Sequence, residues 1–247
     1  MKDLSYLKNH LYTHRGLHND QKKIYENTLK SFDEAIKYGF GIELDTNILK
    51  DGTVVCFHDR NLKRMCGKDI VLKDTTYEEI KDYRIKDSNE TILPLETVLN
   101  YINGRVPVMI ELKPFGKKAL HAKKVYSILK QYPYPISIQS YNPYILLWFK
   151  RHANEITRGQ ISEYFRDDKI SKITKWMMRT LITNRLTKPD FINYGIRDLP
   201  NKYVDKQKKK GVIIFGYAAK NQKQLDFMRK QYDNAVFEDF IPKPIKV

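Results

Sequence analysis

Residues 42–59 read IELDTNILKDGTVVCFHD, two short apolar runs joined by the turn Asp51-Gly52. The first run, over 41–46, and the second, over 53–57, are rich in β-branched residues, which is typical of strands. A turn this short joins antiparallel neighbours, because it cannot carry the crossover that a parallel pair needs. The second run is therefore predicted to be a hairpin above a sheet, ending at His58.

Short apolar runs alternate with amphipathic stretches along the rest of the chain, which is the rhythm of strand–helix units in a parallel α/β sheet. Eight such runs favour a closed (β/α)8 TIM barrel, with candidate strands at 11–14, 41–46, 106–111, 136–139, 156–161, 191–194, 212–217 and 235–238. A chain of 247 residues suits one such domain, spanning 1–247. Residues 62–93, with one helix signal in TYEEIKDY, are predicted to be a small insertion after the second barrel strand.

The N-terminal segment MKDLSYLKNHLY lacks the apolar core and cleavage site of a signal peptide, and no apolar run is long enough to cross a bilayer. The expected location is therefore the cytoplasm. Cys56 and Cys66 have neither metal-binding nor redox spacing and are expected to be reduced thiols.

The charge balance is strongly basic, since 45 Lys and Arg residues against 29 Asp and Glu residues give a net charge of +16 at pH 7. Such an excess attracts phosphate-rich partners over long distances. Nucleic acid, anionic membranes and phosphorylated small molecules all fit this property, and a surface tuned for solubility explains it equally well. Net charge alone does not choose among them.

Polar clusters occur where four predicted elements end, and in a TIM barrel the active site collects at the carboxyl ends of the strands. The clusters are THRG with His14 and Arg15, IELD with Glu43 and Asp45, FHD with His58 and Asp59, and IELK with Glu111 and Lys113. In IELD and IELK the polar residues lie two apart, so both side chains of a pair point to the same side of their strand.

Three of these residues, Glu43, Asp45 and Glu111, would bring carboxylates to one barrel mouth, where they repel one another unless a cation lies among them. Ligation by oxygen alone suits a hard divalent cation such as Mg²⁺ or Ca²⁺. Such a cation would also hold a phosphate oxygen. The carboxylates therefore predict a metal site that binds a phosphorylated substrate.

The remaining residues of the clusters suit the same chemistry. Histidine ordinarily titrates near pH 6.5, so His14 and His58 are candidates for a general acid and a general base. Arg15 and Lys113 offer positive charge to phosphoryl oxygens. A lone histidine or an acidic pair at a strand end is often only structural, but the joint occurrence of these groups in this order favours a functional site.

The strings HRG, YENT, IELDTNILKDGTVVCFHD, LPLETVL and IELKP together resemble the motifs of the glycerophosphodiester phosphodiesterase family. SIQSY near residue 140 and FEDFIP near the C-terminus extend the resemblance over nearly the whole chain. The resemblance implies a barrel with a small insertion that hydrolyses a glycerophosphodiester substrate to an alcohol and sn-glycerol 3-phosphate, using a divalent cation.

Position by position, the resemblance assigns the metal ligands to Glu43, Asp45 and Glu111, the acid and base pair to His14 and His58, and phosphate neutralisation to Arg15 and Lys113. Glu26 in ENT also matches, while Asn27 and Thr28 are expected to cap the following helix. The other histidines lack comparable carboxylate neighbours and are expected at the surface: His10, His18, His121 and His152.

Two departures from the family pattern bear on the choice of substrate. Tyr25 stands where the family commonly has Pro, and Tyr217 and Ala218 stand where it often has Trp-Thr. A lysophospholipase D-like phosphodiesterase with the same metal site is one alternative function. A non-catalytic basic module for anionic lipid or nucleic acid is another, but nucleic acid is not an expected partner because three acidic residues at the mouth would repel a polyanion.

The segment 169–188, KISKITKWMMRTLITNRLTK, is longer than a simple connection requires. Its apolar residues recur at helical spacing and its cations fall on another face, which predicts a basic amphipathic helix. The residues concerned are Ile170, Ile173, Trp176, Met177 and Leu181 on one side and Lys172, Lys175 and Arg179 on the other. Either this is an ordinary barrel helix with its apolar side on the sheet, or it makes peripheral contact with an anionic membrane.

Overall fold

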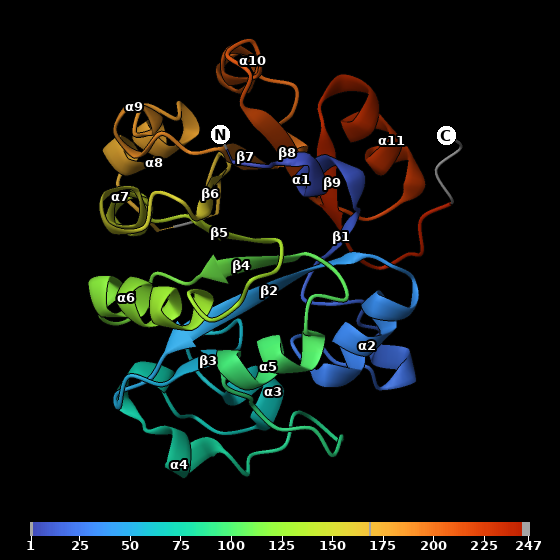
Figure 1. Ribbon diagram of the computed structural model, residues 1–247, viewed down its shortest axis with the longest axis vertical. Helices are drawn as coiled ribbons and strands as arrows, with labels where there is room; N and C mark the ends of the chain where they lie inside the picture. Colours follow the sequence, from blue (N-terminus) through green and yellow to red (C-terminus); the bar gives the residue numbers. More distant parts are fainter. Residues whose placement is uncertain (1, 168, 244–247) are drawn as a thin grey trace.

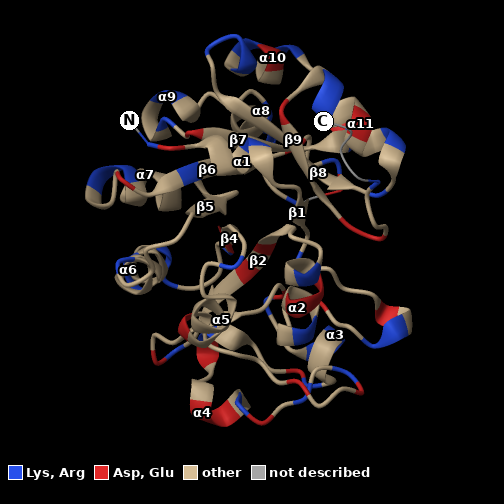
Figure 2. Ribbon diagram, turned by 45° about the vertical axis from the view of Figure 1, so that its right-hand side comes forward, with Lys and Arg blue, Asp and Glu red and all other residues tan. Residues whose placement is uncertain are grey.

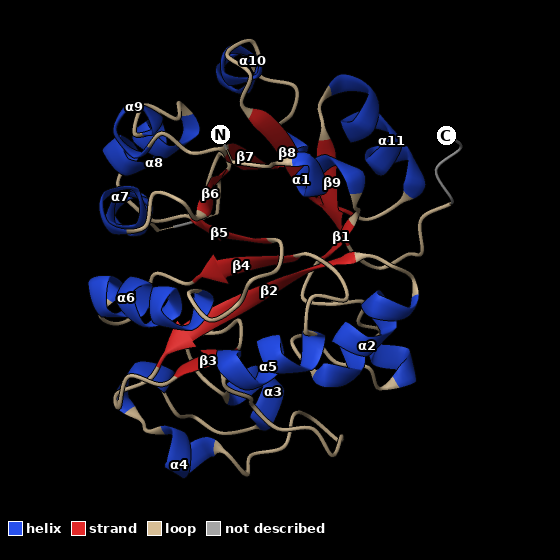
Figure 3. Ribbon diagram, viewed as in Figure 1, coloured by secondary structure: helices blue, strands red, loops and turns tan. Residues whose placement is uncertain are grey.

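The computed structural model describes residues 2–167 and 169–243, in which eight parallel strands form a closed barrel surrounded by helices (Figures 1 and 3). The strands are β1 (Tyr12–Thr13), β2 (Gly41–Ile48), β4 (Val108–Leu112), β5 (Ile136–Ser140), β6 (Thr157–Ser162), β7 (Phe191–Gly195), β8 (Ile213–Ala219) and β9 (Asn234–Phe237). The barrel closes because β1 pairs in parallel with both β2 and β9. The predicted (β/α)8 fold is confirmed.

The predicted hairpin is also present. Strand β3 (Val54–Cys56) pairs antiparallel with the end of β2, so that Cys56 lies opposite Thr46 and Val54 opposite Ile48. The connecting turn contains Gly52 with a φ of +85°, a conformation that glycine adopts without steric cost. The hairpin carries the chain out of the barrel and delivers His58 to its mouth.

The insertion after β3 has a small apolar core of its own. It contains α3 (Lys63–Cys66), a 3₁₀ turn (Leu72–Asp74) and α4 (Tyr77–Ile80), and lies beside β2 and β3 in Figure 1. The side chains of Leu62, Met65, Leu72 and Ile80 are buried there with Phe57 of the hairpin. Residues 1 and 244–247 of the predicted single domain lie outside the described part of the chain.

The helices surround the barrel, and most of them pack an apolar side on its outer face. They are α1 (Ser5–Asn9), α2 (Leu29–Lys37), α5 (Leu95–Ile102), α6 (Lys118–Leu129), α7 (Pro143–His152), α8 (Lys172–Arg179), α9 (Asn184–Thr187), α10 (Lys202–Lys208) and α11 (Gln222–Gln231), with 3₁₀ turns at Asp20–Lys22 and Ile196–Asp198. Phe32 of α2, for example, is buried with the outward-facing Ile42 and Leu44 of β2. Within 2–167 and 169–243, none of the helices has the length and apolar character needed to span a bilayer.

Aromatic side chains fill the interior of the barrel. The rings of Tyr12 and Phe215 lie 5.7 Å apart between centroids, although β1 and β8 are not neighbouring strands. Phe191 packs against the same Phe215 ring. A Cβ at position 159 would approach the Phe191 ring to 2.2 Å, so Gly159 leaves the space that the Phe191 ring occupies. Side chains alternate along a strand, so Met109 in this apolar layer is followed by Glu111 on the same side of β4.

The structure differs from the expectations for segment 169–188 and for His121. Segment 169–188 does not form one helix, because Leu181 has a left-handed φ of 57° between α8 and α9. Its predicted apolar side does not cover the sheet either, since Ile173 and Trp176 are exposed and α8 is buried mainly through Met178. His121, expected at the surface, is fully buried on the inner side of α6.

Candidate active site

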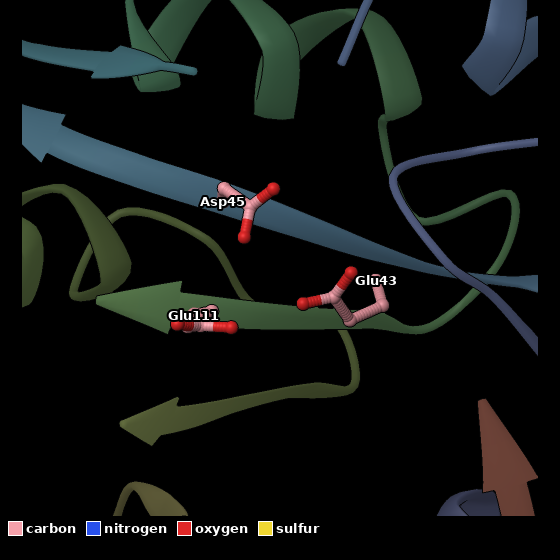
Figure 4. A group of neighbouring side chains, drawn as sticks. All are labelled: Glu43, Asp45 and Glu111. Atoms are coloured by element: carbon pink, nitrogen blue, oxygen red, sulfur yellow. The ribbon is translucent and has the colours of Figure 1, made fainter. Parts of the chain in front are cut away.

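Three carboxylates converge at the carboxyl end of the barrel (Figure 4). Glu43 and Asp45 project from β2 and Glu111 from β4, and each offers an oxygen within 4.8 Å of those of the other two. Asp45 and Glu111 are direct partners in the β2–β4 register, which places their side chains beside each other. All three residues are buried.

The predicted phosphate-binding cations lie against this cluster. Lys113 Nζ is 2.9 Å from Asp45 Oδ1 and 2.7 Å from Glu111 Oε1, and the lysine is buried. Arg15 Nε is 3.2 Å from Asp45 Oδ2, and the backbone N–H of Arg15 donates to Glu43 Oε2 at 3.1 Å. Both cations therefore share their charge with the carboxylates at the mouth.

The positive charge of Arg15 and Lys113 does not balance the cluster. Burial, reinforced by the charges of Asp45 and Glu111, raises the pKa of Glu43 well above its usual range. Burial alone would also raise the pKa of Asp45, but Lys113 and Arg15 lower it below its usual range. Because the Glu43 carboxyl resists ionisation beside Asp45, the residues fit a bound cation that would supply the missing positive charge.

The chemistry of the donors indicates the kind of cation. Glu43, Asp45 and Glu111 offer only oxygen atoms, and the group contains no cysteine or histidine ligand. Hard divalent cations prefer such ligands. A buried divalent cation held here is consistent with the site, and it would polarise a phosphoryl oxygen.

Each predicted catalytic histidine is held by a carboxylate at its Nδ1 atom. His14 Nδ1 is hydrogen-bonded to Glu238, the residue that follows β9, and His58 Nδ1 lies 2.7 Å from Asp59 Oδ1. A carboxylate at Nδ1 fixes the ring orientation and leaves Nε2 to exchange a proton with a substrate. Both histidines line a cavity of about 130 Å³.

The carboxylates behind the histidines are themselves held in the ionised form. Burial would raise the pKa of Glu238, but the hydrogen bond from His14 and the nearby Lys220 lower it below its usual range. The pKa of Asp59 is likewise lowered against the effect of burial by His58 and Arg64. Both carboxylates are therefore charged at neutral pH and accept hydrogen bonds that hold the two imidazole rings in place.

The insertion reaches this site through one arginine. Arg64 Nε donates to Asp59 Oδ2 at 2.7 Å, and the same guanidinium donates to both oxygens of Glu26 at 2.6 and 2.8 Å. Glu26 also accepts from Arg15 at 3.0 Å. Glu26, the acidic residue of ENT, therefore links Arg15 to the insertion and is not part of the carboxylate cluster.

Three amide side chains at the site were not predicted. Asn27 donates to Asp45 Oδ2 at 2.9 Å, so it supports the cluster, and Thr28 alone accepts the capping bond of α2. Gln139 donates to Glu43 Oε1 at 3.1 Å and accepts from Asn193 at 3.0 Å. Gln139 and Asn193 lie on strands β5 and β7, so polar residues at those strand ends were the available signal.

The structure brings all seven predicted site residues together. Six of them line the cavity of about 130 Å³, namely His14, Arg15, Glu43, His58, Glu111 and Lys113, and Asp45 is fully buried beside them. Tyr141 and Tyr217 line the same cavity, and the Tyr141 hydroxyl donates to that of Tyr217 at 2.6 Å. Of the two departures from the family pattern, Tyr217 and Ala218 lie at the mouth, whereas Tyr25 is buried in the apolar core of the insertion.

Residues 14–243 match the sequence model described as the glycerophosphoryl diester phosphodiesterase family. The chain belongs to this family. Membership makes it a phosphoric diester hydrolase and confirms the resemblance seen in its motifs. The match begins at His14 and extends past Glu238, so it contains both histidine–carboxylate pairs as well as the carboxylate cluster.

Individual relatives agree with this assignment. A protein of Caldanaerobacter subterraneus subsp. tengcongensis named glycerophosphodiester phosphodiesterase is 27% identical over 248 residues, which cover 94% of this chain and 95% of that one. A mouse protein named Lysophospholipase D GDPD1 is 31% identical over 143 residues, covering 53% of this chain and 44% of that one. Among solved structures, an Oleispira antarctica phosphodiesterase in complex with the product sn-glycerol-3-phosphate has a TM-score of 0.80 at 22% identity, with 94% of each chain covered. The last comparison shows the shared fold.

Proposed function

We propose that this chain hydrolyses glycerophosphodiesters to an alcohol and sn-glycerol 3-phosphate, with Mg²⁺ or Ca²⁺ held by Glu43, Asp45 and Glu111. The observation that carries the proposal is the convergence of these three buried carboxylates with two histidines and two cations at one barrel mouth, in a chain of this family. The family relative from Caldanaerobacter carries the name of the same activity.

Charge balance supports a phosphodiester as the ligand. With all three carboxylates ionised, the site formed by them, Arg15 and Lys113 has a net charge of −1. A bound divalent cation would change this net charge to +1. A phosphodiester carries a single negative charge and complements that site. The guanidinium of Arg15 and the ammonium of Lys113 would then bind the oxygens that the cation does not hold.

The two histidines would carry the proton transfers. One accepts a proton from the nucleophile, which is water or a neighbouring hydroxyl of the glycerol, and the other protonates the departing alkoxide. Both are suited to this role because Glu238 and Asp59 occupy Nδ1 and leave Nε2 towards the cavity. An aryl phosphodiester has a good leaving group and needs no general acid. If this substrate restores the turnover of one histidine-to-alanine variant, the histidine replaced in that variant is the general acid.

A second hollow suits a polar alcohol. It has a volume of about 450 Å³ and shares His14 and Tyr217 with the smaller cavity. Glu163, Arg197 and Lys220 are among its lining residues, so it offers charges of both signs. We place the group that is released from phosphorus in this hollow, because only a hydrated or charged group would gain from such a lining.

A lysophospholipase D-like activity is the second candidate. It is favoured by apolar side chains exposed on α8, which follows barrel strand β6, and by the similarity to the mouse protein named Lysophospholipase D GDPD1. The same metal site would serve both reactions. The non-catalytic basic module is set aside because the chain belongs to a family of enzymes.

The test is a comparison of substrates and cations with the purified protein. Glycerophosphocholine, glycerophosphoethanolamine and lysophosphatidylcholine are each supplied with Mg²⁺, Ca²⁺ or chelator, and sn-glycerol 3-phosphate and choline are measured. Release of glycerol 3-phosphate from the first two substrates supports the main proposal. Turnover of lysophosphatidylcholine alone would replace it with the second candidate, and no metal-dependent release from any of them would reject both.

A further inference from the structure

Four apolar side chains of the α8 region lie exposed on one side. Ile170, Ile173, Trp176 and Met177 have exposed fractions of 40%, 72%, 48% and 37%. Positions 176 and 177 follow position 173 by three and four residues, so the three side chains share one face of the helix. Ile170 precedes the N-cap residue Ser171. We call these four residues the α8 surface. Single exposed apolar residues are common, but three on one helix face with a fourth just before the helix form a contiguous apolar surface.

The carboxyl end of α8 is hydrogen-bonded to the barrel close to the mouth. Ser162, the last residue of β6, donates its hydroxyl to the carbonyl of Met178 at 2.8 Å, and Tyr194 near the end of β7 donates to the carbonyl of Arg179 at 3.1 Å. In Figure 1 the arrows of β2 and β4 point to the side on which α8 and α9 lie. The α8 surface is therefore held at the carboxyl end of the barrel.

A short aromatic path leads from this segment to the cavity. Phe165, between β6 and α8, packs against Tyr141 with ring centroids 5.9 Å apart. Tyr141 lines the cavity that contains His14 and His58. The segment that carries the α8 surface thus begins at the rim of the active site.

The charged residues of the segment that carries the α8 surface, 169–188, are all basic, although exposed Asp167 lies just before them. Residues 169–188 contain six Lys or Arg residues and no acidic residue. Lys172, Lys175 and Arg179 fall on the helix face next to the apolar one, again three or four positions apart. Figure 2 shows that Lys and Arg also occupy α7 and α9, and that α4 of the insertion carries Asp and Glu.

We propose that the α8 surface docks on anionic lipid bilayers. The four apolar side chains enter the interface while Lys172 and Lys175 lie at the level of the anionic headgroups, which is how basic amphipathic helices bind membranes. A second copy of the chain is a poorer partner, because docking two α8 surfaces would bring their cations together without an acidic group in 169–188 to pair them. Docking would hold the active-site mouth beside the bilayer.

The first experiment measures binding to vesicles without substrate, so its result is independent of hydrolysis. Vesicles of phosphatidylglycerol with phosphatidylcholine, and of phosphatidylcholine alone, are sedimented with wild type and with the Trp176→Ala, Met177→Ala double variant. We expect wild type to bind the anionic vesicles and the variant to bind them about tenfold more weakly. The matched control is Tyr38→Ala, Ile241→Ala, which removes two exposed apolar side chains that line a different hollow. The proposal is overturned if both double variants weaken vesicle binding equally, or if Trp176→Ala, Met177→Ala does not weaken it.

A second pair of variants separates local charge from net charge. The first variant is Lys172→Gln, Lys175→Gln, in α8. The second is Lys209→Gln, Lys210→Gln, which removes the same charge at the end of α10. The proposal requires the first pair to weaken vesicle binding about tenfold and the second to change it little. Equal losses would show that only net charge matters, and the α8 surface would then have no specific role.

Tryptophan fluorescence provides a direct readout. The chain has two tryptophans, so Trp148→Phe leaves Trp176 as the sole reporter. Its emission should move to shorter wavelength on anionic vesicles and be quenched by brominated lipid. If the protein binds vesicles but its emission spectrum does not change, the proposal is overturned. It is also overturned if wild type is a dimer and the Trp176→Ala, Met177→Ala variant is a monomer that binds vesicles as well as wild type does. Unchanged thermal unfolding and unchanged hydrolysis of a soluble substrate show that the variants are folded.

Discussion

His14 and Glu238 lie 224 positions apart in the chain, yet Nδ1 of His14 is hydrogen-bonded to the Glu238 carboxylate. They meet because β1 and β9 are parallel neighbours that close the barrel, and each residue directly follows its strand. The ionised carboxylate of Glu238 fixes the orientation of the imidazole ring. Closure of the barrel therefore completes one of the two histidine–carboxylate pairs of the site.

Replacing Glu238 by Gln should lower kcat about tenfold and change KM less, because the residue acts on the chemical step by positioning His14. Steady-state kinetics with glycerophosphocholine measure both constants. Glu238→Asp should restore part of kcat, and Asp239→Asn, which removes an exposed carboxylate next in the chain, should have little effect. A change in KM alone would contradict the positioning role.

Replacing either histidine should remove a proton-transfer group. We expect His14→Ala and His58→Ala each to lower kcat at least about 100-fold, the usual scale for a lost general acid or base. Both rings line the cavity and neither is fully buried, so thermal unfolding should change little. His152→Ala, an exposed histidine of α7, serves as the control. Near-normal turnover in either variant would remove that residue from the mechanism.

Binding of a divalent cation should stabilise the folded protein, because the cluster does not exist in the unfolded chain. Mg²⁺ or Ca²⁺ should raise the Tm of wild type, and chelation should abolish hydrolysis. Glu43→Gln should weaken cation binding, measured by calorimetry, at least about tenfold and should reduce the increase in Tm that the cation causes. Glu26→Gln removes a carboxylate outside the cluster and should keep the shift. Full activity after exhaustive chelation would reject the metal site.

His121 should make the fold sensitive to acid. Burial lowers its pKa to about 4, with a partial offset from the backbone of Lys113, whereas histidine in an unfolded chain titrates near 6.5. Between these values the unfolded state binds more protons, so the stabilisation is complete above pH 6.5 and is lost as the pH falls through 4. The loss of unfolding free energy is roughly 3 kcal/mol.

Urea unfolding at pH 7 and pH 4.5 measures this effect. His121→Leu should show a smaller decrease between the two pH values than wild type, because the titrating group is gone. His152→Ala, whose ring is exposed, should keep the full decrease. Identical decreases in wild type and His121→Leu would assign the acid sensitivity to other groups.

Much of the fold and the centre of the site follow from local sequence pattern. Alternation along strands places Glu43 and Asp45 on one side of β2, and the parallel arrangement brings the end of β4 beside them. The short turn at Asp51-Gly52 required β3 to be antiparallel. These features can be predicted from the two-residue period of a strand, the length of the turn and the rule that parallel strands all end at the same edge of a barrel.

Contacts between distant segments depended on the tertiary structure. The pairing of His14 with Glu238, and of Arg64 with Glu26, joins elements whose register no local pattern encodes. Burial of His121 and exposure of Trp176 have the same origin. Helical periodicity tells which residues share a face, but what covers that face depends on where neighbouring elements pack. The sequence therefore determined the strands and the chemical groups at their ends, and only the closed barrel decided which of those groups touch and which remain open to solvent.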